Sequence, residues 1–304
     1  MKSDPDRAAL WKQIFNERAP DIDFRAWPNV GDPRDITCLL TWDVPTNLRD
    51  EFPNIELVYA IGAGVDHIDL STIPTDVDLV RMMEPGIQAS MNEYVLMSVL
   101  CAHRNLVEYI NQSRDSVWME IPVIPAKVRR VGIMGAGMLG VGAMNALLPL
   151  GFQIRLWSRS RKAIVNAEVF AGADELPSFL SGCDILVCLL PLTPETRGTL
   201  NAALFASLPA GAVVINVSRG GNLNQDDLIT ALDSGHLRAA FLDVCEPEPL
   251  PPESALWRHP KIVLTPHIAT KTQPQTAADT VIRNIARRRR GEPMDDLVDR
   301  QRGY

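Results

Sequence analysis

A glycine-rich stretch, VGIMGAGMLG at 131–140, restricts the possible folds of this chain more than any other segment. It contains the spacing G-x-G-x-x-G at Gly135, Gly137 and Gly140, between a β-rich run and a helical one. Gly135 permits a tight turn, Gly137 lets the backbone approach a pyrophosphate, and Gly140 allows the helix to pack closely on the strand. The first amides of that helix would then face the phosphates. In this context the motif predicts dinucleotide binding, with a simple packing turn as the alternative.

Helical patterns and short β-rich runs alternate along the chain, which is typical of parallel α/β layers. Three strands are predicted in the first part of the chain, at 36–42, 55–62 and 76–82. The glycine motif belongs to a second series of six predicted strands, at 128–134, 152–157, 184–190, 212–217, 238–244 and 261–265. Between the two series, Ser90 and Glu93 form a capping-box pattern that predicts the start of a long apolar helix running to about Asn111. A last helix is predicted from about Pro274 to Arg290. It ends in four arginines, which we interpret as a solvated helix end because cations are favourable there.

Length and strand order together predict the domain organisation. The chain has 304 residues, 46% of them hydrophobic and 22% charged, and this length favours two globular domains. We predict an α/β fold of two doubly wound parallel-sheet domains with a cleft between them. Residues 1–95 and 272–304 form the predicted substrate domain. Residues 96–271 form the predicted Rossmann domain, whose six strands suit a dinucleotide-binding sheet.

Charge and cysteine spacing argue against several other classes of function. The formal net charge is -7 and the pI is near 5.3, so nucleic acid is a poor candidate partner. No apolar run approaches the roughly 20 residues that span a bilayer, so we expect no membrane partner. The five cysteines lack C-x-x-C spacing and lie mostly in apolar stretches, which predicts reduced, buried thiols and no metal site. We expect a cytoplasmic protein.

A basic turn follows the second strand of the glycine-motif series. Sites that take NAD usually carry an acid here, which accepts hydrogen bonds from the ribose hydroxyls. This chain instead reads LWSRSRK, with Ser158, Arg159, Ser160 and Lys162 at or after the strand end. A guanidinium and hydroxyl groups suit a 2′-phosphate, and the turn lacks the carboxylate that usually accepts hydrogen bonds from a 2′-hydroxyl. The turn therefore predicts NADPH (NADP+) as the cofactor, with a solvent-exposed basic turn as the alternative.

Three later segments, INVSRGG, LDVCEPEPLP and LTPHIA, follow in an order that resembles the D-isomer-specific 2-hydroxyacid dehydrogenase family. Supporting segments are IGAGVD (61–66), MNEY (91–94), LLPLTPET (189–196) and the terminal VDRQRGY, so the resemblance spans nearly the whole chain. With WSRSRK, these features resemble the glyoxylate/hydroxypyruvate reductase A branch of that family. Cys245 departs from the pattern, because phenylalanine is usual at that place.

The resemblance implies a catalytic trio, which maps onto Arg219, Glu248 and His267. Reduction of a 2-oxoacid needs a carboxylate anchor, a proton donor and a source of hydride. Arg219 can fork onto the substrate carboxylate and polarise the ketone oxygen. His267 can supply the proton, because imidazole titrates near neutrality, and Glu248 would orient it. Glu246 is the alternative partner of the histidine if the register of the loop differs.

Other predicted contacts surround this trio. The backbone of Gly62–Gly64, including Ala63 and Gly64, could hold the substrate carboxylate in a small nest, which implies a small 2-oxoacid. The resemblance places Trp42 in the substrate pocket, with a packing role as the alternative. The predicted cofactor contacts lie in the glycine motif, the basic turn and the segments after the later strands: Gly135, Gly137, Met138, Leu139, Gly140, Ser158, Arg159, Ser160, Lys162, Leu190, Pro191, Thr196, Val217, Ser218, Asp243 and His267.

These assignments predict NADPH-dependent reduction of glyoxylate to glycolate and of hydroxypyruvate to D-glycerate, by hydride transfer to C2 with His267 as proton donor. A bulkier 2-oxoacid is an alternative substrate. A non-catalytic dinucleotide-sensing regulator is the alternative outside enzymes, because such proteins resemble these dehydrogenases even in the trio. The resemblance also implies a homodimer through the apolar helix that follows Ser90.

Overall fold

The computed structural model describes residues 5–304, which divide into two compact units. The first unit combines the described residues up to Gln88 with Lys271–Tyr304, and the second is Ala89–Thr270. Each unit contains its own parallel sheet covered by helices, so the predicted α/β fold class is confirmed. Within the described residues, no helix has both the length and the apolar character needed to cross a bilayer.

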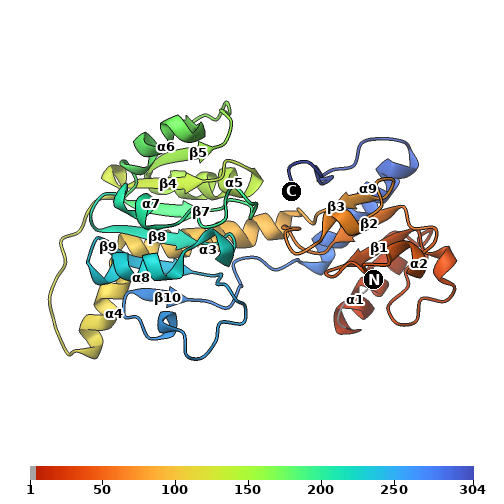
Figure 1. Cartoon of the computed structure of the whole chain (residues 1–304), viewed down its shortest axis with the longest axis horizontal. Coiled ribbons are helices and arrows are strands. Elements are labelled where there is room, and N and C mark those ends of the chain that lie inside the picture. Colours follow the sequence, from red (N-terminus) through yellow and green to blue (C-terminus); the bar gives the residue numbers. More distant parts are fainter. Residues whose placement is uncertain (1–4) are drawn as a thin grey trace. The chain divides into compact units, whose positions relative to one another are not determined.

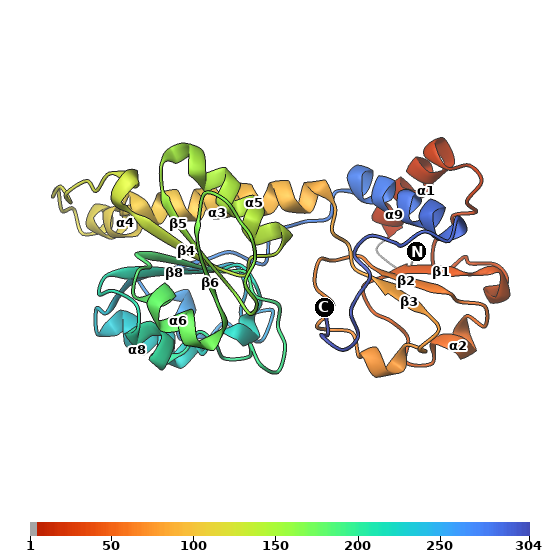
Figure 2. The same ribbon diagram turned by 90° about the horizontal axis from the view of Figure 1, so that it is seen from above.

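Three parallel strands, in the order β1-β2-β3, form the sheet of the first unit. They are β1 (Cys38–Thr41), β2 (Leu57–Ala60) and β3 (Asp78–Val80). Figure 2 shows α1 (Pro5–Arg18) and α9 (Pro274–Arg289) over one face of this sheet and α2 (Leu48–Glu51) over the other. All four residues of β2 are buried, because the strand has a neighbour on each side and helices on both faces.

Seven parallel strands form the sheet of the second unit, in the order β10-β9-β8-β7-β4-β5-β6 (Figure 1). They are β4 (Arg130–Met134), β5 (Gln153–Ser158), β6 (Glu168–Ala171), β7 (Ile185–Cys188), β8 (Ala212–Asn216), β9 (Leu237–Leu242) and β10 (Ile262–Leu264). The strand order reverses between β4 and β7. In open parallel sheets, ligands bind beyond the carboxyl ends of the strands at such a reversal.

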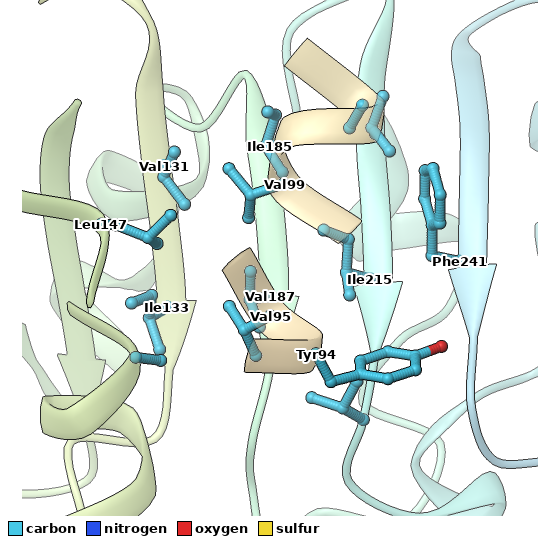
Figure 3. Packing of buried hydrophobic residues seen from close by; sticks show 14 of the residues in the cluster. Tyr94, Val95, Val99, Val131, Ile133, Leu147, Ile185, Val187, Ile215 and Phe241 are labelled. Carbon is cyan, nitrogen blue, oxygen red and sulfur yellow. The ribbon is translucent and has the colours of Figure 1, made fainter. Parts of the chain in front are cut away.

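Hydrophobic side chains cover both faces of the seven-stranded sheet. Helices α3 (Pro85–His103) and α5 (Met138–Leu147) pack on one face, and α6 (Gly172–Leu180), α7 (Ala202–Ala206) and α8 (Gln225–Asp233) pack on the other. Figure 3 shows side chains of α3 against side chains of the central strands: Tyr94, Val95 and Val99 against Ile185, Val187 and Ile215. Burial on both faces explains why these strands read as continuous apolar runs.

The nine strands predicted from the sequence are confirmed, with ends that shift by a few residues, and the structure adds a tenth. This additional strand, β6, pairs only with β5 at the edge of the sheet. Of its residues, only Phe170 is buried. A short edge strand with one buried side chain does not produce the alternation or apolar run by which strands are recognised in a sequence.

The predicted helix start at Ser90 is wrong, because α3 begins at Pro85. The carboxylate of Glu84 accepts hydrogen bonds from the backbone amides of Gly86 and, at 3.0 Å, of Ile87. Glu84 therefore satisfies amides that would otherwise lack partners at the helix start. Proline at the first helical position fits the same boundary, and Ser90 lies inside the helix.

The same helix also ends earlier than predicted. It stops at His103, and a second helix, α4, runs over Leu106–Arg114. Between them, Asn105 has a φ of 55°, in the left-handed region that asparagine tolerates better than most residues. The apolar pattern continues across this break, so the pattern alone could not locate it.

The four arginines at 287–290 mark the end of α9, as predicted. Each pairs with a carboxylate of the first unit: Arg287 with Asp295, Arg288 with Asp78 and Glu56, Arg289 with Asp21, and Arg290 with Glu292. The charge of this run is therefore balanced within the first unit, which agrees with a helix end and not with a patch for a polyanion.

Candidate active site

Most of the predicted site residues lie at one edge of the seven-stranded sheet. Because all seven strands are parallel, their carboxyl ends meet at this edge. The residues are Gly135 after β4, Ser158 at the end of β5, Leu190 after β7, Arg219 after β8, Asp243 after β9 and His267 after β10. The fold thus gathers segments that are distant in the sequence.

The three glycines of the motif meet different geometric requirements. Gly135 has a φ of 112°, and a Cβ there would lie 2.7 Å from the carbonyl oxygen of Leu189. At Gly140 a Cβ would overlap the carbonyl oxygen of Gly135, so only glycine lets α5 pack this closely on the turn. Gly137 precedes the first residue of α5, and apart from its chain neighbours no atom lies within 4 Å of a Cβ built there. The space beside Gly137 at the start of α5 is therefore open, which suits a pyrophosphate.

The basic turn after β5 is joined to this glycine loop. Nζ of Lys162 donates a hydrogen bond to the carbonyl oxygen of Ala136 at 2.8 Å. Oγ of Ser158 donates to the carbonyl oxygen of Ser160 at 2.9 Å, which closes the turn. Lys162 therefore lies against the loop that is predicted to hold the pyrophosphate.

The two arginines of the basic turn have different surroundings. Arg161 donates to the carbonyl oxygen of Val169 at 3.1 Å and forms an ion pair with Glu175. The side chain of Arg159 is exposed. A hydrogen bond from the Thr193 hydroxyl holds the pKa of Glu195 below its usual value, and the positive charge of Arg159 acts in the same direction. Arg159 thus lies near the loop that follows β7, whereas Arg161 is tied to β6 and α6.

Glu248 and His267 form a direct pair. Nδ1 of His267 lies 2.7 Å from Oε2 of Glu248, and both side chains are about one third exposed, at 36% and 38%. The other carboxylate oxygen of Glu248 accepts a hydrogen bond from the backbone amide of Cys245 at 3.0 Å. Glu246 instead pairs with Arg197 at 2.8 Å. The structure therefore favours Glu248 over Glu246 as the partner of the histidine.

The backbone around His267 is held in an uncommon conformation. His267 has a φ of 53°, and its amide donates to the carbonyl oxygen of Asp243 at 2.8 Å. The fully buried carboxylate of Asp243 accepts hydrogen bonds from the next two amides, those of Ile268 and Ala269, each at 2.8 Å, and from the Thr265 hydroxyl at 2.6 Å. Left-handed backbone at a non-glycine residue persists only where its surroundings impose it. Here the hydrogen bonds to Asp243 impose the left-handed backbone at His267 and so fix the direction of its imidazole.

Arg219 lies at the start of a short 3-10 helix, Gly220–Asn222, and its side chain is half-buried. The side-chain amide of Asn216 donates to the carbonyl oxygen of Arg219 at 3.1 Å, so a fully buried polar group fixes the backbone here. A Cβ at Gly220 would overlap the carbonyl group of Cys245. The segments that carry Arg219 and Glu248 are therefore in direct backbone contact.

The remaining predicted cofactor contacts contribute mainly apolar surface and backbone. Leu190 and Val217 are buried. Oγ1 of Thr196 donates to the carbonyl oxygen of Pro191 at 2.6 Å, and Oγ of Ser218 donates to Oδ1 of Asn216 at 2.7 Å. These hydroxyls stabilise the loops in which they lie, and their contact with a cofactor stays a prediction.

Trp42, Ala63 and Gly64 belong to the first unit. A Cβ built at Gly62 would lie 2.7 Å from Cζ3 of Trp42, so the indole borders the predicted glycine nest. Trp42 is 44% exposed, which distinguishes it from a tryptophan of the core such as Trp11.

A thiol, that of Cys245, lies close to the candidate pair. Burial raises the pKa of Cys245 to about 11, and the carboxylates of Glu248 and Asp243 act in the same direction. The thiol next to the candidate pair is therefore protonated and weakly nucleophilic. Between residues 5 and 304, no group of three or more His, Cys, Asp or Glu side chains could hold a metal ion.

Comparison with known proteins identifies the family of this chain. The family model "D-isomer specific 2-hydroxyacid dehydrogenase, NAD binding domain" matches residues 96–269, more than half of the sequence. The chain belongs to the D-isomer-specific 2-hydroxyacid dehydrogenase family. A curated relative, glyoxylate/hydroxypyruvate reductase A of Klebsiella pneumoniae, is 39% identical over 303 residues, which cover 97% of this chain and 96% of the relative.

Solved structures of the family share the fold of this dehydrogenase. A D-isomer specific 2-hydroxyacid dehydrogenase from Xanthobacter autotrophicus, crystallised with NADPH and MES, is 40% identical with a TM-score of 0.94, covering 99% of this chain and 98% of that one. The NADPH-dependent glyoxylate/hydroxypyruvate reductase of Sinorhizobium meliloti, crystallised with NADP and sulfate, is 36% identical with a TM-score of 0.89, covering 97% and 96%.

Several residues that support the site of this dehydrogenase were not found from its sequence. Oη of Tyr94 lies 2.6 Å from Oγ1 of Thr265, which extends the hydrogen-bond chain from Asp243 to α3. Arg197 was not recognised as the partner of Glu246. MNEY and LTPHIA contain Tyr94 and Thr265, but neither segment carries a signal that the two side chains meet.

Proposed function

We propose that this protein reduces glyoxylate to glycolate and hydroxypyruvate to D-glycerate, with NADPH as the hydride donor. The observation that carries the proposal is the 2.7 Å pair between Glu248 and His267, at the same sheet edge as Arg219 and the glycine loop. The curated relative from Klebsiella pneumoniae and the solved structure from Sinorhizobium meliloti, both named for glyoxylate and hydroxypyruvate, support this choice of substrates.

Each member of the trio has a proposed part in the reaction. Arg219 binds the substrate carboxylate and polarises the ketone oxygen, because its guanidinium is planar and permanently charged. His267 donates a proton from Nε2 to that oxygen, since Nδ1 faces Glu248. Glu248 stabilises the protonated imidazole and fixes its orientation. When bound, NADPH supplies the hydride that C2 accepts.

The residues around the glycine loop fit NADPH. The open space beside Gly137 and the first amides of α5 suit the pyrophosphate. Lys162 lies against the same loop, and Arg159 extends from the end of β5, where an acid would favour NAD. The NADPH in the Xanthobacter autotrophicus structure and the NADP in the Sinorhizobium meliloti structure support this assignment.

Replacing Arg159 by alanine should raise the Kd for NADPH about ten- to hundredfold, the effect of losing a hydrogen bond to a charged group. The Kd for NADH, which lacks the 2′-phosphate, should change little. Both constants can be measured by titrating the fluorescence of the reduced nicotinamide. Arg161→Ala is the matched control, because Arg161 already pairs with Glu175. Equal weakening of NADPH and NADH by Arg159→Ala would contradict a phosphate contact.

We further propose that the protein is a homodimer. Exposed large apolar side chains are concentrated between residues 97 and 128: Met97, Leu100, Leu106, Ile110, Val117, Trp118, Met119, Val123, Ile124 and Val128. Monomeric proteins rarely expose so large a group of apolar side chains, and such a group usually marks a protein–protein interface. Light scattering should give twice the chain mass of 33.6 kDa, and Trp118→Ser should shift the population toward the monomer. A monomeric wild-type protein would contradict the proposal.

We also propose a cytoplasmic location, where thiols stay reduced. All five cysteines are unpaired in the described chain. Burial raises the pKa of Cys183 to about 12, which keeps that thiol protonated.

The proposed reaction can be tested with purified protein by following NADPH absorbance after addition of glyoxylate or hydroxypyruvate. NADH and a series of bulkier 2-oxoacids run in parallel. Oxidation of NADPH by the two small substrates is the expected result. Turnover of bulkier acids alone would contradict the substrate assignment. Tight NADPH binding without turnover of any oxoacid would favour the sensing regulator.

A further inference from the structure

The indole of Trp42 is held by two neighbours in the first unit. The ring of His67 lies parallel to it, with ring centroids 4.0 Å apart and planes inclined by 9°. Nε2 of His67 also lies 2.9 Å from the carbonyl oxygen of Trp42. A hydrogen bond and a ring stack therefore both hold the imidazole beside Trp42. A Cβ at Gly62 would lie 2.7 Å from Cζ3 in the six-membered ring of the indole, so only glycine fits beside that ring.

The sheet explains why these residues meet. Trp42 directly follows β1, and Gly62 follows β2 by one residue. The two strands are parallel with Thr41 opposite Ala60, and the amide of Ile61 donates to the carbonyl oxygen of Thr41 at 3.1 Å. The two carboxyl ends are thus in register, and the indole extends over the start of the glycine nest.

Trp42 would otherwise be poorly restrained. An indole that is 44% exposed can change both side-chain torsions unless neighbouring groups prevent it. Offset parallel stacking is a favoured arrangement of aromatic rings. The stack on His67 therefore selects the rotamer that places the indole beside Gly62.

The position of the indole bears on the size of the substrate. The sequence predicts that the backbone of Ala63 and Gly64 contacts the carboxylate of the substrate. In a 2-oxoacid, the variable substituent is only two bonds from that carboxylate carbon. A group that borders the nest therefore limits the substituent, and the indole borders it at Gly62.

We propose that His67 determines substrate size by holding the Trp42 indole against Gly62. This inference rests on the proposed function, because glyoxylate and hydroxypyruvate carry the carboxylate that the nest is predicted to contact. His67 is a positioning residue, since it acts through Trp42. The arrangement admits the hydrogen of glyoxylate and the hydroxymethyl group of hydroxypyruvate and excludes branched or aromatic substituents.

Two substitutions separate the stack from the imidazole nitrogen. His67→Ala removes the ring, and His67→Phe keeps a ring that can stack. In His67→Ala, the ratio of kcat/KM for glyoxylate to that for 2-oxoisovalerate should fall by about tenfold or more, the scale of discrimination by small apolar groups. In His67→Phe the ratio should remain near that of the wild type. His259→Ala is the control, because His259 pairs with Asp233 in the second unit.

A second readout does not depend on turnover. Acrylamide quenching of tryptophan fluorescence, with Trp42→Phe variants subtracted, reports the accessibility of the Trp42 indole. It should increase in His67→Ala and stay unchanged in His67→Phe. If the ratio of kcat/KM values in His67→Ala equals that of the wild type, the proposal is overturned, whether the quenching increases or stays unchanged. A wild-type protein inactive on both small substrates would overturn the proposed function, whereas the quenching still tests the stack.

Discussion

Replacement of His267 by alanine should lower kcat for glyoxylate by roughly 10²–10⁴-fold, the usual contribution of a positioned acid-base group. The Kd for NADPH should be nearly unchanged, because the glycine loop and the basic turn remain intact. Stopped-flow measurement of NADPH oxidation gives kcat, and fluorescence titration gives the Kd.

The backbone at this position calls for a matched variant. His267 has a φ of 53°, which alanine adopts at a cost and asparagine tolerates. His267→Asn should therefore lose turnover to the same extent while keeping the native turn, as judged by thermal unfolding. Glu248→Gln, whose amide oxygen can still accept a hydrogen bond from Nδ1 of His267, should lose less activity than His267→Ala or His267→Asn. Wild-type turnover in His267→Asn would contradict the proton-donor role.

Replacement of Arg219 by glutamine should lower kcat/KM for glyoxylate on the order of 10²–10³-fold, comparable to removing a donor that stabilises developing negative charge on oxygen. Arg219→Lys should recover only part of this loss, because an ammonium cannot fork onto a carboxylate. Steady-state kinetics over a range of glyoxylate concentrations give KM and kcat separately. KM should rise because the carboxylate loses its anchor, and kcat should fall because the ketone is no longer polarised.

Arg197→Gln is the matched control for Arg219. Arg197 lies on a neighbouring loop and pairs with Glu246, but the pair is about half exposed, at 55% and 50%. Exposed ion pairs contribute roughly 0–1 kcal/mol, so the loss in kcat/KM should be only a few-fold. Equal losses in the two variants would indicate that Arg219 acts through loop structure and not through substrate contact.

The strands were predictable because parallel strands buried on both faces appear as apolar runs between turn residues. That signal was absent for β6, where only Phe170 is buried. The start of α3 was misplaced for a different reason. Ser90 and Glu93 have the spacing of a capping box, but Glu84, six residues before Ser90, already caps the helix. A local motif cannot show which of two candidate starts the chain adopts.

The sequence also predicts the candidate trio, because its three segments follow the glycine motif in a family order, and the roles of the three residues stay a prediction. The proline-rich segment that contains both acids also predicts Glu248, and not Glu246, as the partner of the histidine, because proline and leucine follow Glu248. The ion pair of Glu246 with Arg197, which lies in a different loop, supports that choice. Asp243 was assigned to the cofactor from the sequence, and its support of the His267 turn emerges only when β9 and β10 lie side by side. Contacts between distant loops have no local signature.

The chain leaves the first unit after Gln88 and returns to it at Lys271. The returning segment supplies α9 and places Val298 in the core beside β3, and the Arg300 guanidinium bonds to three carbonyl groups of the loop before that strand. During translation the N-terminal part therefore cannot finish its core until all of 89–270 has been made, which takes roughly ten seconds to half a minute at usual rates. The dinucleotide-binding unit is contiguous and can fold as it emerges from the ribosome. The residues of the dinucleotide-binding core are thus all synthesised before the last residues of the first core.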